Sequence, residues 1–527
     1  MRIPDALMRL LLATVTLAPF VGFAARPARV QQSDAKLQSE PSPPDENTPR
    51  ELIYPYYSLR EGYDSTLYLM DRSPRTIEYT VAFHSLSGQT VWAKARTIGP
   101  HDDVEINVKD LLEDLGVDYR GDFLEGSLSI HFKGQGNPLG GRMVVKGPHE
   151  TLNMGPVWSM GEYRQNMVPV VLNALWHDLG GSRDVEATVT NITGQSVTAD
   201  FHIEFGGKRH TPDALRFAPH ETKHISITEA LAALKLTAFQ APIGGFTIAA
   251  RGGPPALVAQ GKITDADSGQ ITALEFPLPQ VQAASALHAT GVPIGRPTLD
   301  SPFAGARDAN FIPHLYLRNL LGSGQTLNLT IEYPGEDGPK ATTLPPIILG
   351  GYTTQEMRLD DYFTYLPLPL PYCSIRIQYN GPRGSVIGEL TAVNETSGMA
   401  SQIGLANEGN GYVGSLSSYW SFDERTDFIV FLTNMGEKEC RVGFRIEAGG
   451  ATYFLTHLKL ISHETKPINL RELIDKHEPD FQGSLIPANT TEGRLSYIRL
   501  DNVPMMGRVT VVPRIPKPAE PPKETPQ

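Results

Sequence analysis

The sequence predicts an all-β protein of four tandem antiparallel β-sandwich domains, each with one short helical turn. Two observations lead to this prediction. A pair of short strands with alternating apolar residues occurs four times, and two further blocks follow each copy in the same order. The composition is also rich in turn formers, with 49 Gly and 43 Pro in 527 residues, which suits many short strands. A chain of this length should divide into several hydrophobic cores.

The first block of each copy has two strands joined by a polar turn, and we interpret it as a hairpin. In the second copy, DVEATVTNITGQSVTADFHIEFGG, Val185, Ala187 and Val189 share one face before the turn, and the alternation resumes at Val197. A polar residue marks the turn in every copy and is called the anchor below: Asp71, Asn191, Asn319 and Asn434. We expect the anchor to form the turn and not to bind a ligand.

The second block reads as a tight turn, a strand and one or two helical turns. The helical segment contains an acidic residue followed by an apolar pair in each copy, and these acids are Asp110, Glu229, Asp361 and Glu472. An acidic residue in the first turn is favoured by the helix dipole.

The third block has a strand, a turn with Gly, Pro or Asn, and a second strand. A glycine recurs in that second strand, at Gly141, Gly261, Gly388 and Gly507. We expect a bulge there, or a close backbone approach that a side chain would block.

The spacing of these landmarks defines the domains. The anchor recurs after 120, 128 and 115 residues, which is the length of a whole domain and not of a solenoid repeat. The predicted sandwich repeats cover residues 51–163, 164–290, 299–408 and 411–513. The Pro- and Gly-containing segment 276–298 is expected to be a linker or a long edge segment.

With six or seven short strands each, these units resemble the immunoglobulin-like repeats of exported bacterial proteins. The resemblance covers about residues 51 to 513 and concerns architecture only. The Cys…Trp…Cys pattern of true immunoglobulin domains is missing. The resemblance therefore implies a fold and assigns no residue a role.

Both ends of the chain differ from the repeats. Residues 1–24 contain an apolar run from Leu10 to Phe23 followed by small residues, which indicates a cleaved signal peptide. An uncleaved anchor is the alternative, but the run is interrupted by Pro19 and is short for a span of ~20 residues. Residues 25–50 and the Pro-rich tail 514–527 are expected to be disordered. The mature chain is then exported to the periplasm, the cell surface or the medium, with no transmembrane span.

The net charge of −12 argues against a nucleic-acid partner, which requires a basic face. We expect the partner to be an unknown protein or glycan at the cell surface. Only two cysteines occur, Cys373 and Cys440, and they are expected to be separately buried thiols, with an inter-domain bridge as the alternative.

One pattern suggests a metal site. His220 and His224 are four residues apart, which puts both on one face of a strand beside Glu221, and imidazole suits zinc. However, the His–acid pair recurs as His101-Asp102 and His463-Glu464, and the third copy has Tyr352-Thr353 instead. A feature repeated in tandem domains favours a structural turn, capped by the carboxylate or hydroxyl.

Two further patterns have structural alternatives. Asp265 to Gly269 begins like a calcium loop, but its sixth and twelfth positions are Gln270 and Phe276, which favours a polar hairpin turn. Tyr54, Tyr56 and Tyr57 cluster at the start of the first repeat and are candidates for binding a glycan by stacking. Packing in a core or at a domain junction is the favoured alternative.

The sequence has no G-x-S-x-G elbow and no G-K-[ST] phosphate loop. We therefore expect a non-catalytic protein without a cofactor that acts as a surface or periplasmic scaffold or as an adhesion-type binding module. The alternatives are a carbohydrate-binding protein that uses the aromatic residues of the first repeat, and a metal-dependent hydrolase.

Overall fold

The structure is a computed structural model. It describes residues 49–71, 73–100, 102–134, 138–148, 151–154, 157–160, 171–180, 183–251, 256–265, 267, 271–274, 276, 285–306, 309–394, 400–407, 415–421, 426–448, 451–475, 481–482, 492–499, 501 and 503–513. The predicted signal peptide, nearly all of the spacer 25–50 and the tail 514–527 lie outside these residues.

The first unit consists of two antiparallel sheets. One has the order β10 (Val157–Met160), β1 (Pro49–Ser58), β7 (Glu125–Lys133), β3 (Ile77–Ser85) and β4 (Thr90–Trp92), with β5 (Arg96–Ile98) also paired to β3. The other has the order β6 (Asp103–Asn107), β2 (Asp64–Asp71), β8 (Leu139–Lys146) and β9 (Thr151–Met154).

The second unit repeats this arrangement. Its first sheet has the order β11 (Val171–Trp176), β17 (Gly244–Ala250), β13 (Val197–Phe205) and β14 (Lys208–His210), with β15 (Leu215–Phe217) also on β13. Its second sheet has the order β16 (Thr222–Ser226), β12 (Arg183–Asn191), β18 (Leu257–Asp265) and β19 (Ile271–Leu274).

The third unit has one sheet in the order β23 (Gly338–Thr343), β22 (Gln325–Gly335), β26 (Cys373–Tyr379), β20 (Ala286–Val292) and β29 (Ala406–Asn407), with β24 (Ile347–Leu349) also on β22. The other has the order β25 (Thr354–Arg358), β21 (Phe311–Asn319), β27 (Val386–Asn394) and β28 (Ala400–Gly404).

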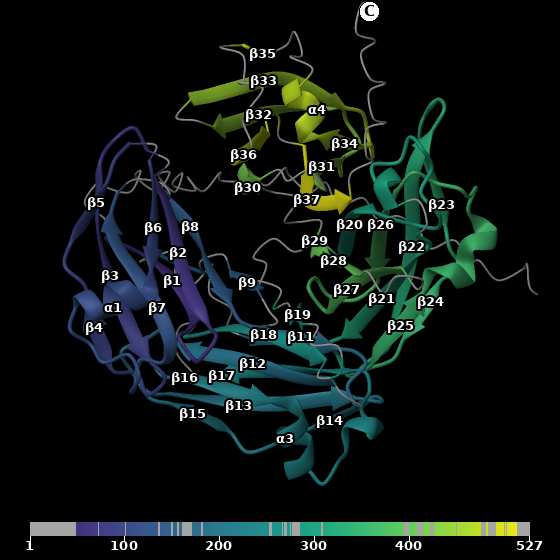
Figure 1. Cartoon of the computed structure of the whole chain (residues 1–527). Coiled ribbons are helices and arrows are strands. Elements are labelled where there is room, and N and C mark those ends of the chain that lie inside the picture. The colour runs from purple at the N-terminus through teal and green to yellow at the C-terminus, as the bar shows by residue number, and fades with distance from the viewer. Residues whose placement is uncertain are drawn as a thin grey trace, which may run out of the picture. The chain divides into compact units, whose positions relative to one another are not determined.

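The fourth unit has one sheet in the order β30 (Ser415–Ser421), β36 (Glu492–Arg499), β32 (Cys440–Ala448), β33 (Ala451–Leu460) and β35 (Phe481–Gln482). The other has the order β34 (Thr465–Asn469), β31 (Thr426–Asn434) and β37 (Met505–Pro513). The described strands thus form four pairs of sheets with one recurring strand order (Figure 1), and the predicted tandem-sandwich fold is confirmed.

A separate hydrophobic core lies between the two sheets of each unit. In the first unit, Leu67 and Leu69 of β2 pack in one cluster with Leu128 and Ile130 of β7, which belongs to the other sheet. Because successive strand residues point to opposite faces, the alternating apolar residues of both strands meet between the sheets.

The predicted hairpin interpretation of the first block is wrong. Its two strands, such as β12 and β13, lie in different sheets of the same unit and do not pair with each other. The inward apolar residues Val185 and Val189 therefore face Phe201 and Ile203 across the core. Alternating apolar residues in the sequence show which face of a strand points into the core. The same alternation occurs in two strands paired in one sheet and in two strands from opposite sheets, so it cannot distinguish them.

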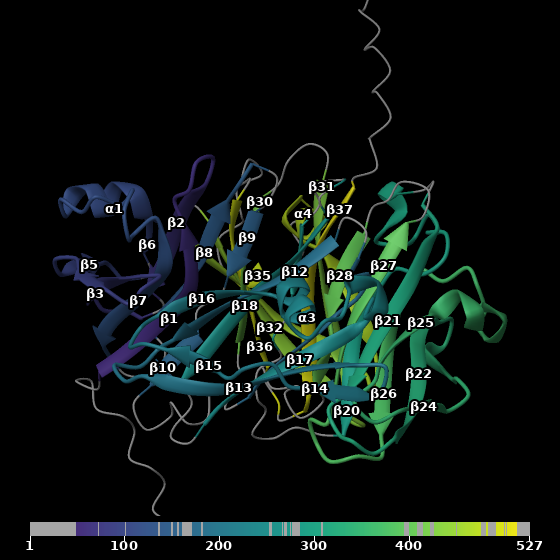
Figure 2. The same cartoon turned by 90° about the horizontal axis from the view of Figure 1, so that it is seen from below.

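The predicted helical turns are present in all four units. They are α1 (Val108–Asp114), α3 (Ile227–Ala233), the 3-10 helix η4 (Leu359–Tyr365) and α4 (Leu470–Asp475), and each carries its predicted acidic residue in the first turn. Figures 1 and 2 show α1 following directly on β6. The N-caps were not predicted: Asn107 and Ser226 each accept a hydrogen bond from the N–H of the acidic residue three positions later.

Several finer expectations are also met. A Cβ atom at Gly141, Gly261 or Gly388 would clash with a backbone carbonyl of the neighbouring strand in the same sheet and with a side chain packed there, which explains these glycines by close approach. The strands β18 and β19 pair on either side of the Asp265 turn, and Asp265 accepts the N–H of Asp267 at 3.0 Å. The two strands thus form the predicted hairpin, and residues 266 and 268–270 of its turn lie outside the described residues. The described residues also include two short 3-10 helices, η2 (Ala238–Gln240) and η3 (Ala304–Ala306).

The segment 276–298 is not only a connection. Its residues 286–292 form β20, which pairs with β26 of the third unit and is buried along its length. The third unit therefore includes a strand that comes before residue 299.

Cys373 and Cys440 are both buried and lie in the cores of the third and fourth units. They are the two separate thiols expected, and burial raises the pKa of the Cys373 thiol. Among the helices that the structure describes, none is long and apolar enough to cross a membrane.

Candidate functional site

The anchor ties two turns together in every unit. The anchor N–H donates to a carbonyl in the turn of the second block, for example from Asn191 to Glu221 O at 2.9 Å and from Asn434 to Glu464 O at 2.9 Å. In the three asparagine anchors the amide side chain adds further hydrogen bonds. Asn434 Nδ2 donates to Lys438 O, Leu460 O and Ile461 O at 2.7–3.1 Å. The anchors are buried, and their polar groups form hydrogen bonds with backbone groups of the turns. They are therefore turn formers, as predicted.

The repeated histidine occupies a special backbone position in the turn that the anchor holds. His220 and His463 have φ of 56° and 58°, and Tyr352 has φ of 50° at the same place in the third unit. The adjacent acid closes the turn, since Glu221 Oε2 accepts the N–H of Ala218 at 2.6 Å and Glu464 Oε2 accepts that of Ile461 at 2.8 Å. This confirms the predicted structural turn. The fourth counterpart, His101, lies outside the described residues. We call His220, Tyr352 and His463 the turn residues.

The metal candidates have separate partners. His220 stacks on His84 of the first unit with ring centroids 4.6 Å apart, Glu221 forms an ion pair with Lys223 at 3.1 Å, and His224 contacts Glu186. In the part of the chain that the structure describes, no group of three or more His, Cys, Asp or Glu side chains could hold a metal ion.

The tyrosine candidates for glycan stacking are inside the protein. Tyr54 and Tyr57 have no exposed surface and Tyr56 is 4% exposed, and all three belong to the core cluster of the first unit. A ring that stacks on a sugar has to present its face to solvent. The carbohydrate alternative based on these residues is therefore not supported, and the predicted core and junction packing is correct.

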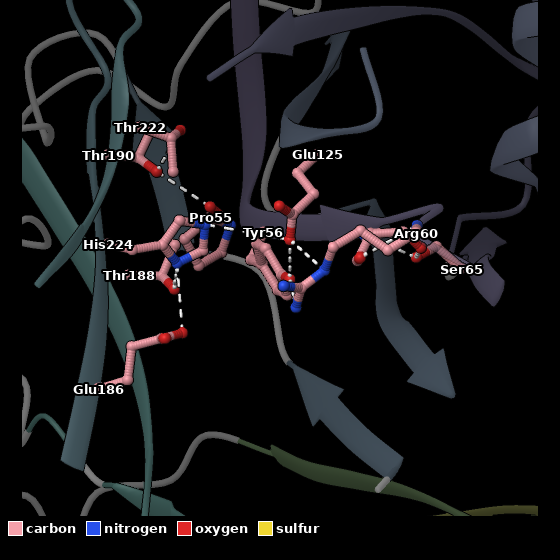
Figure 3. A network of polar contacts seen from close by, with 11 residues as sticks. Pro55, Tyr56, Arg60, Ser65, Glu125, Glu186, Thr188, Thr190, Thr222 and His224 are labelled. Carbon is pink, nitrogen blue, oxygen red and sulfur yellow. Dashed lines mark hydrogen bonds and ion pairs between the residues drawn. The ribbon is translucent and has the colours of Figure 1, made fainter. Parts of the chain in front are cut away.

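The structure brings Tyr56 and His224 together in one network where the first two units meet (Figure 3). On the side of the first unit, Tyr56 Oη donates to Glu125 Oε1 at 2.6 Å, and Arg60 Nε lies 3.0 Å from the same oxygen. The Tyr56 ring meets the His224 ring edge to face, with centroids 5.7 Å apart.

His224 of β16 completes the network from the second unit. Its Nδ1 lies 3.2 Å from Glu186 Oε1 and 3.1 Å from Thr188 Oγ1, and its Nε2 lies 4.0 Å from Glu125 Oε1. The imidazole therefore sits between carboxylates of both units, as Figure 3 shows.

Backbone groups also cross this junction. Thr190 Oγ1 donates to Pro55 O at 2.9 Å, and the N–H of Thr222 donates to Leu86 O at 3.0 Å. Ile53 of β1 packs with Ile192 and Val258 of the second unit. The junction thus combines an apolar patch with specific polar contacts, as stable interfaces between domains do.

Three groups at the junction of the first two units have shifted pKa values. Burial, together with the nearby Glu125 carboxylate, raises the pKa of Tyr56 above its usual range, so its hydroxyl stays protonated. The hydrogen bond with His224 lowers the pKa of Glu186. Burial lowers the pKa of His84 to about 3, with further contributions from His220 and His131, so His84 is neutral where it stacks on His220.

The same positions build the next two junctions. At each junction, the residue before the anchor contacts the preceding unit. Thr190 donates to Pro55 O, as described for the first junction. Arg318 donates to Ala174 O and Phe246 O at 2.6 and 2.7 Å, and the Thr433 hydroxyl contacts that of Thr290. We call this the reaching residue.

A second shared position lies thirteen residues after the anchor of the preceding unit, at His84, Glu204 and Glu332. We call it the facing residue. His84 stacks on His220, Glu204 forms an ion pair with Arg318 at 2.5 Å, and Glu332 lies 3.5 Å from His463. Tyr352, the turn residue of the second junction, lies under the guanidinium of Arg209 at 4.2 Å.

A further titratable group sits at the second junction. The His177 ring stacks on Tyr316 at 4.1 Å, and its nitrogens lie 3.0 Å from Asp178 and 3.6 Å from Glu389. Burial opposes the charge on this histidine, but its contacts with the two carboxylates outweigh burial and raise the pKa of His177 to about 9.

Four residues of these junctions were not predicted from the sequence: Arg318, Glu204, Glu125 and His177. One signal was available for Arg318: a charged residue at this point of the apolar strand HLYLRN is unexpected unless it is paired. Comparison of the sequence with protein-family models and with curated proteins gives no match.

Proposed function

We propose that the chain is an exported, non-catalytic scaffold, whose sandwiches are held in series by their junctions and present a surface to a protein or glycan outside the cytoplasm. The observation that carries this proposal is the reuse of one junction design three times, with reaching, facing and turn residues at equivalent positions. A chain that rebuilds its junctions in this way is suited to holding its domains in a fixed order.

The histidines, acids and tyrosines that resemble reactive groups support the same proposal, because they are engaged in turns and junctions. His220 and Glu221 belong to a turn, and Tyr56 and His224 belong to a junction network. The proposal of export rests on the leader-like residues 1–24.

The test expresses the full chain with a C-terminal tag in a bacterial host, with a version that lacks residues 1–24 as the control. We expect the full chain to lose about 24 residues by intact mass, to appear in the periplasmic or surface fraction, and to capture a partner after cross-linking of intact cells. The control should remain in the cytoplasm. Full-length chain in the cytoplasmic fraction with its N-terminus intact would contradict the proposal.

A further inference from the structure

An exposed tryptophan lies on the outer face of the first sheet of the first unit. Trp92 of β4 is 53% exposed, whereas Trp176 and Trp420 are buried in the cores of their units. The cross-strand neighbour of Trp92 on β3 is Ala82, and its indole ring contacts the imidazole of His131 on β7, with centroids 4.7 Å apart. Because β4 and β7 flank β3, their backbones lie about 9.5 Å apart.

The two rings therefore lean toward each other over β3. Ala82 lies between them on the outer face, since its neighbours Val81 and Phe83 point into the core. It has no exposed surface, as expected for a small residue beneath the rings. One side of the Trp92 indole is thus packed on the sheet, and the exposed rest of the ring forms a flat apolar surface, which we call the platform.

Polar side chains border the platform. Nε2 of His131 lies 3.5 Å from Glu51 Oε1 of β1 and 2.8 Å from Ser129 Oγ. The side chains of His131 and Glu51 are 36% and 21% exposed, so both can be reached from solvent. Burial lowers the pKa of His131, although the Glu51 carboxylate opposes this shift, and the imidazole is therefore neutral near neutral pH. The platform thus combines a flat ring with a carboxylate and a neutral imidazole at its edge.

The fold does not require an aromatic ring at this position. The residue opposite the position two before the facing residue is Trp92 in the first unit, Thr343 in the third and Phe454 in the fourth. In the second unit Thr211 holds the corresponding place, where it contacts His202 at 3.1 Å. A residue that the sandwich needed would recur in every unit, as the helical turns do. The exposed indole of the first unit is therefore better explained by binding.

We propose that the platform of Trp92, with Glu51 and His131 at its edge, binds a glycan by stacking a pyranose ring on the indole. An apolar C–H face of a pyranose fits a flat aromatic ring, whereas the sugar hydroxyl groups require polar partners beside it. Glu51 can accept charge-assisted hydrogen bonds from hydroxyl groups, and the His131 ring adds a neutral partner.

The chemistry of the platform also selects a class of glycan. Pyranoses whose substituents are all equatorial have the flattest apolar faces, and the Glu51 carboxylate disfavours acidic sugars. The ligand class is therefore a neutral β-linked glucose or N-acetylglucosamine oligomer. This assignment rests on the proposed function, because it selects a glycan from the partners outside the cytoplasm.

The test measures binding of cellotetraose and of chitotetraose to the purified full chain by isothermal titration calorimetry. Trp92→Thr introduces the residue type that the third unit has at Thr343, so this variant should fold. Trp92→Phe retains a flat ring, and Glu51→Gln removes the carboxylate charge. The matched control is Phe239→Thr, because Phe239 of η2 is 79% exposed and its ring belongs to the second unit. Circular dichroism and thermal melting check every variant.

We expect at least one tetrasaccharide to bind, and both Trp92→Thr and Glu51→Gln to weaken its binding by about tenfold or more. Trp92→Phe should weaken binding less than Trp92→Thr does, and Phe239→Thr should leave it unchanged. No binding of either tetrasaccharide, or unchanged binding in folded Trp92→Thr protein, would overturn the proposal. If Glu51→Gln does not fold, the comparison of Trp92→Thr with Phe239→Thr decides.

Two further results separate this proposal from its neighbours. Capture of a cross-linked protein that depends on Trp92, with neither tetrasaccharide bound, would overturn the glycan assignment in favour of a protein partner. Failure of export would contradict the proposed function without changing the calorimetry of the purified chain. Absence of binding by a chain that is exported would overturn this proposal alone.

Discussion

Replacing Arg318 by methionine should loosen the junction between the second and third units. The side chain of Arg318 is fully buried, and its guanidinium donates to Ala174 O, Phe246 O, Glu204 Oε2 and Thr247 Oγ1 at 2.5–2.9 Å. Its removal leaves the Glu204 carboxylate buried, with the ion pair to Arg209 still in place. Loss of one partner from a buried ion pair costs about 3–5 kcal/mol, and because Arg209 remains, we expect about 3 kcal/mol.

Hydrogen–deuterium exchange is the suitable assay, because the unfolding of a multidomain chain is not a single transition. A loss of about 3 kcal/mol corresponds to roughly a hundredfold faster exchange of amides protected by the junction, in peptides from β11, β17 and β21. Exchange in the first unit should stay unchanged. The double variant Arg318→Met, Glu204→Met should recover most of the protection, since the buried carboxylate that lost one of its two arginine partners is gone.

The control for this experiment is Arg251→Ala. Arg251 forms an ion pair with Asp200 at 2.6 Å on the surface of the same unit, and we expect no measurable change in exchange. If Arg318→Met accelerates exchange no more than this control does, or if the double variant is worse than the single one, the reasoning about the buried pair is refuted.

Three further predictions concern the anchor, the turn and pH. Asn434→Ala should lower the free energy of unfolding of the fourth unit by roughly 2–3 kcal/mol, because it removes the hydrogen-bond donors to buried carbonyls. An unchanged urea midpoint for that unit would contradict this. His220→Val should lower the melting temperature, whereas His220→Asn should leave it nearly unchanged. The reason is that the position has φ of 56°, which Asn tolerates and a β-branched residue does not. Equal melting temperatures for the two variants would refute the turn interpretation. The pKa of His177 is raised to about 9, so its contribution to stability is fully present below about pH 6.5 and is lost as the pH rises through about 9. Exchange at the second junction should therefore accelerate from pH 7 to pH 10 beyond the intrinsic rate, and a profile identical in His177→Gln would count against this assignment.

The sequence allows the repeat, the strand positions and the helical turns to be predicted, because each depends on local patterns. The path between sheets could not be predicted in the same way. The positions of Val189 and Phe201 show only which face of each strand points into the core. The pattern of inward residues is the same in a hairpin and in two strands that face each other across a core.

The junctions were harder still to predict, because their shared positions carry different chemistry. The reaching residue is Thr190, Arg318 or Thr433, and the facing residue is His84, Glu204 or Glu332. Neither position keeps one residue type at all three junctions, so only their contacts reveal the equivalence. The turn residues were found in sequence, but their φ values distinguish a turn from a ligand set.

Disulfide trapping across the third junction tests most directly the claim that consecutive units dock through the reaching residue. Thr290 and Thr433 are buried, and their hydroxyl groups are in hydrogen-bonding contact, so Thr290→Cys with Thr433→Cys should form a disulfide in high yield, as measured by mass spectrometry of peptides after mild oxidation. The matched control, Thr290→Cys with Thr190→Cys, uses the reaching residue of another unit and should not cross-link. The account predicts near-complete cross-linking of the first pair in monomeric protein with an unchanged melting profile. Absence of the cross-link in folded monomer, or equal yields for the two pairs, would contradict it.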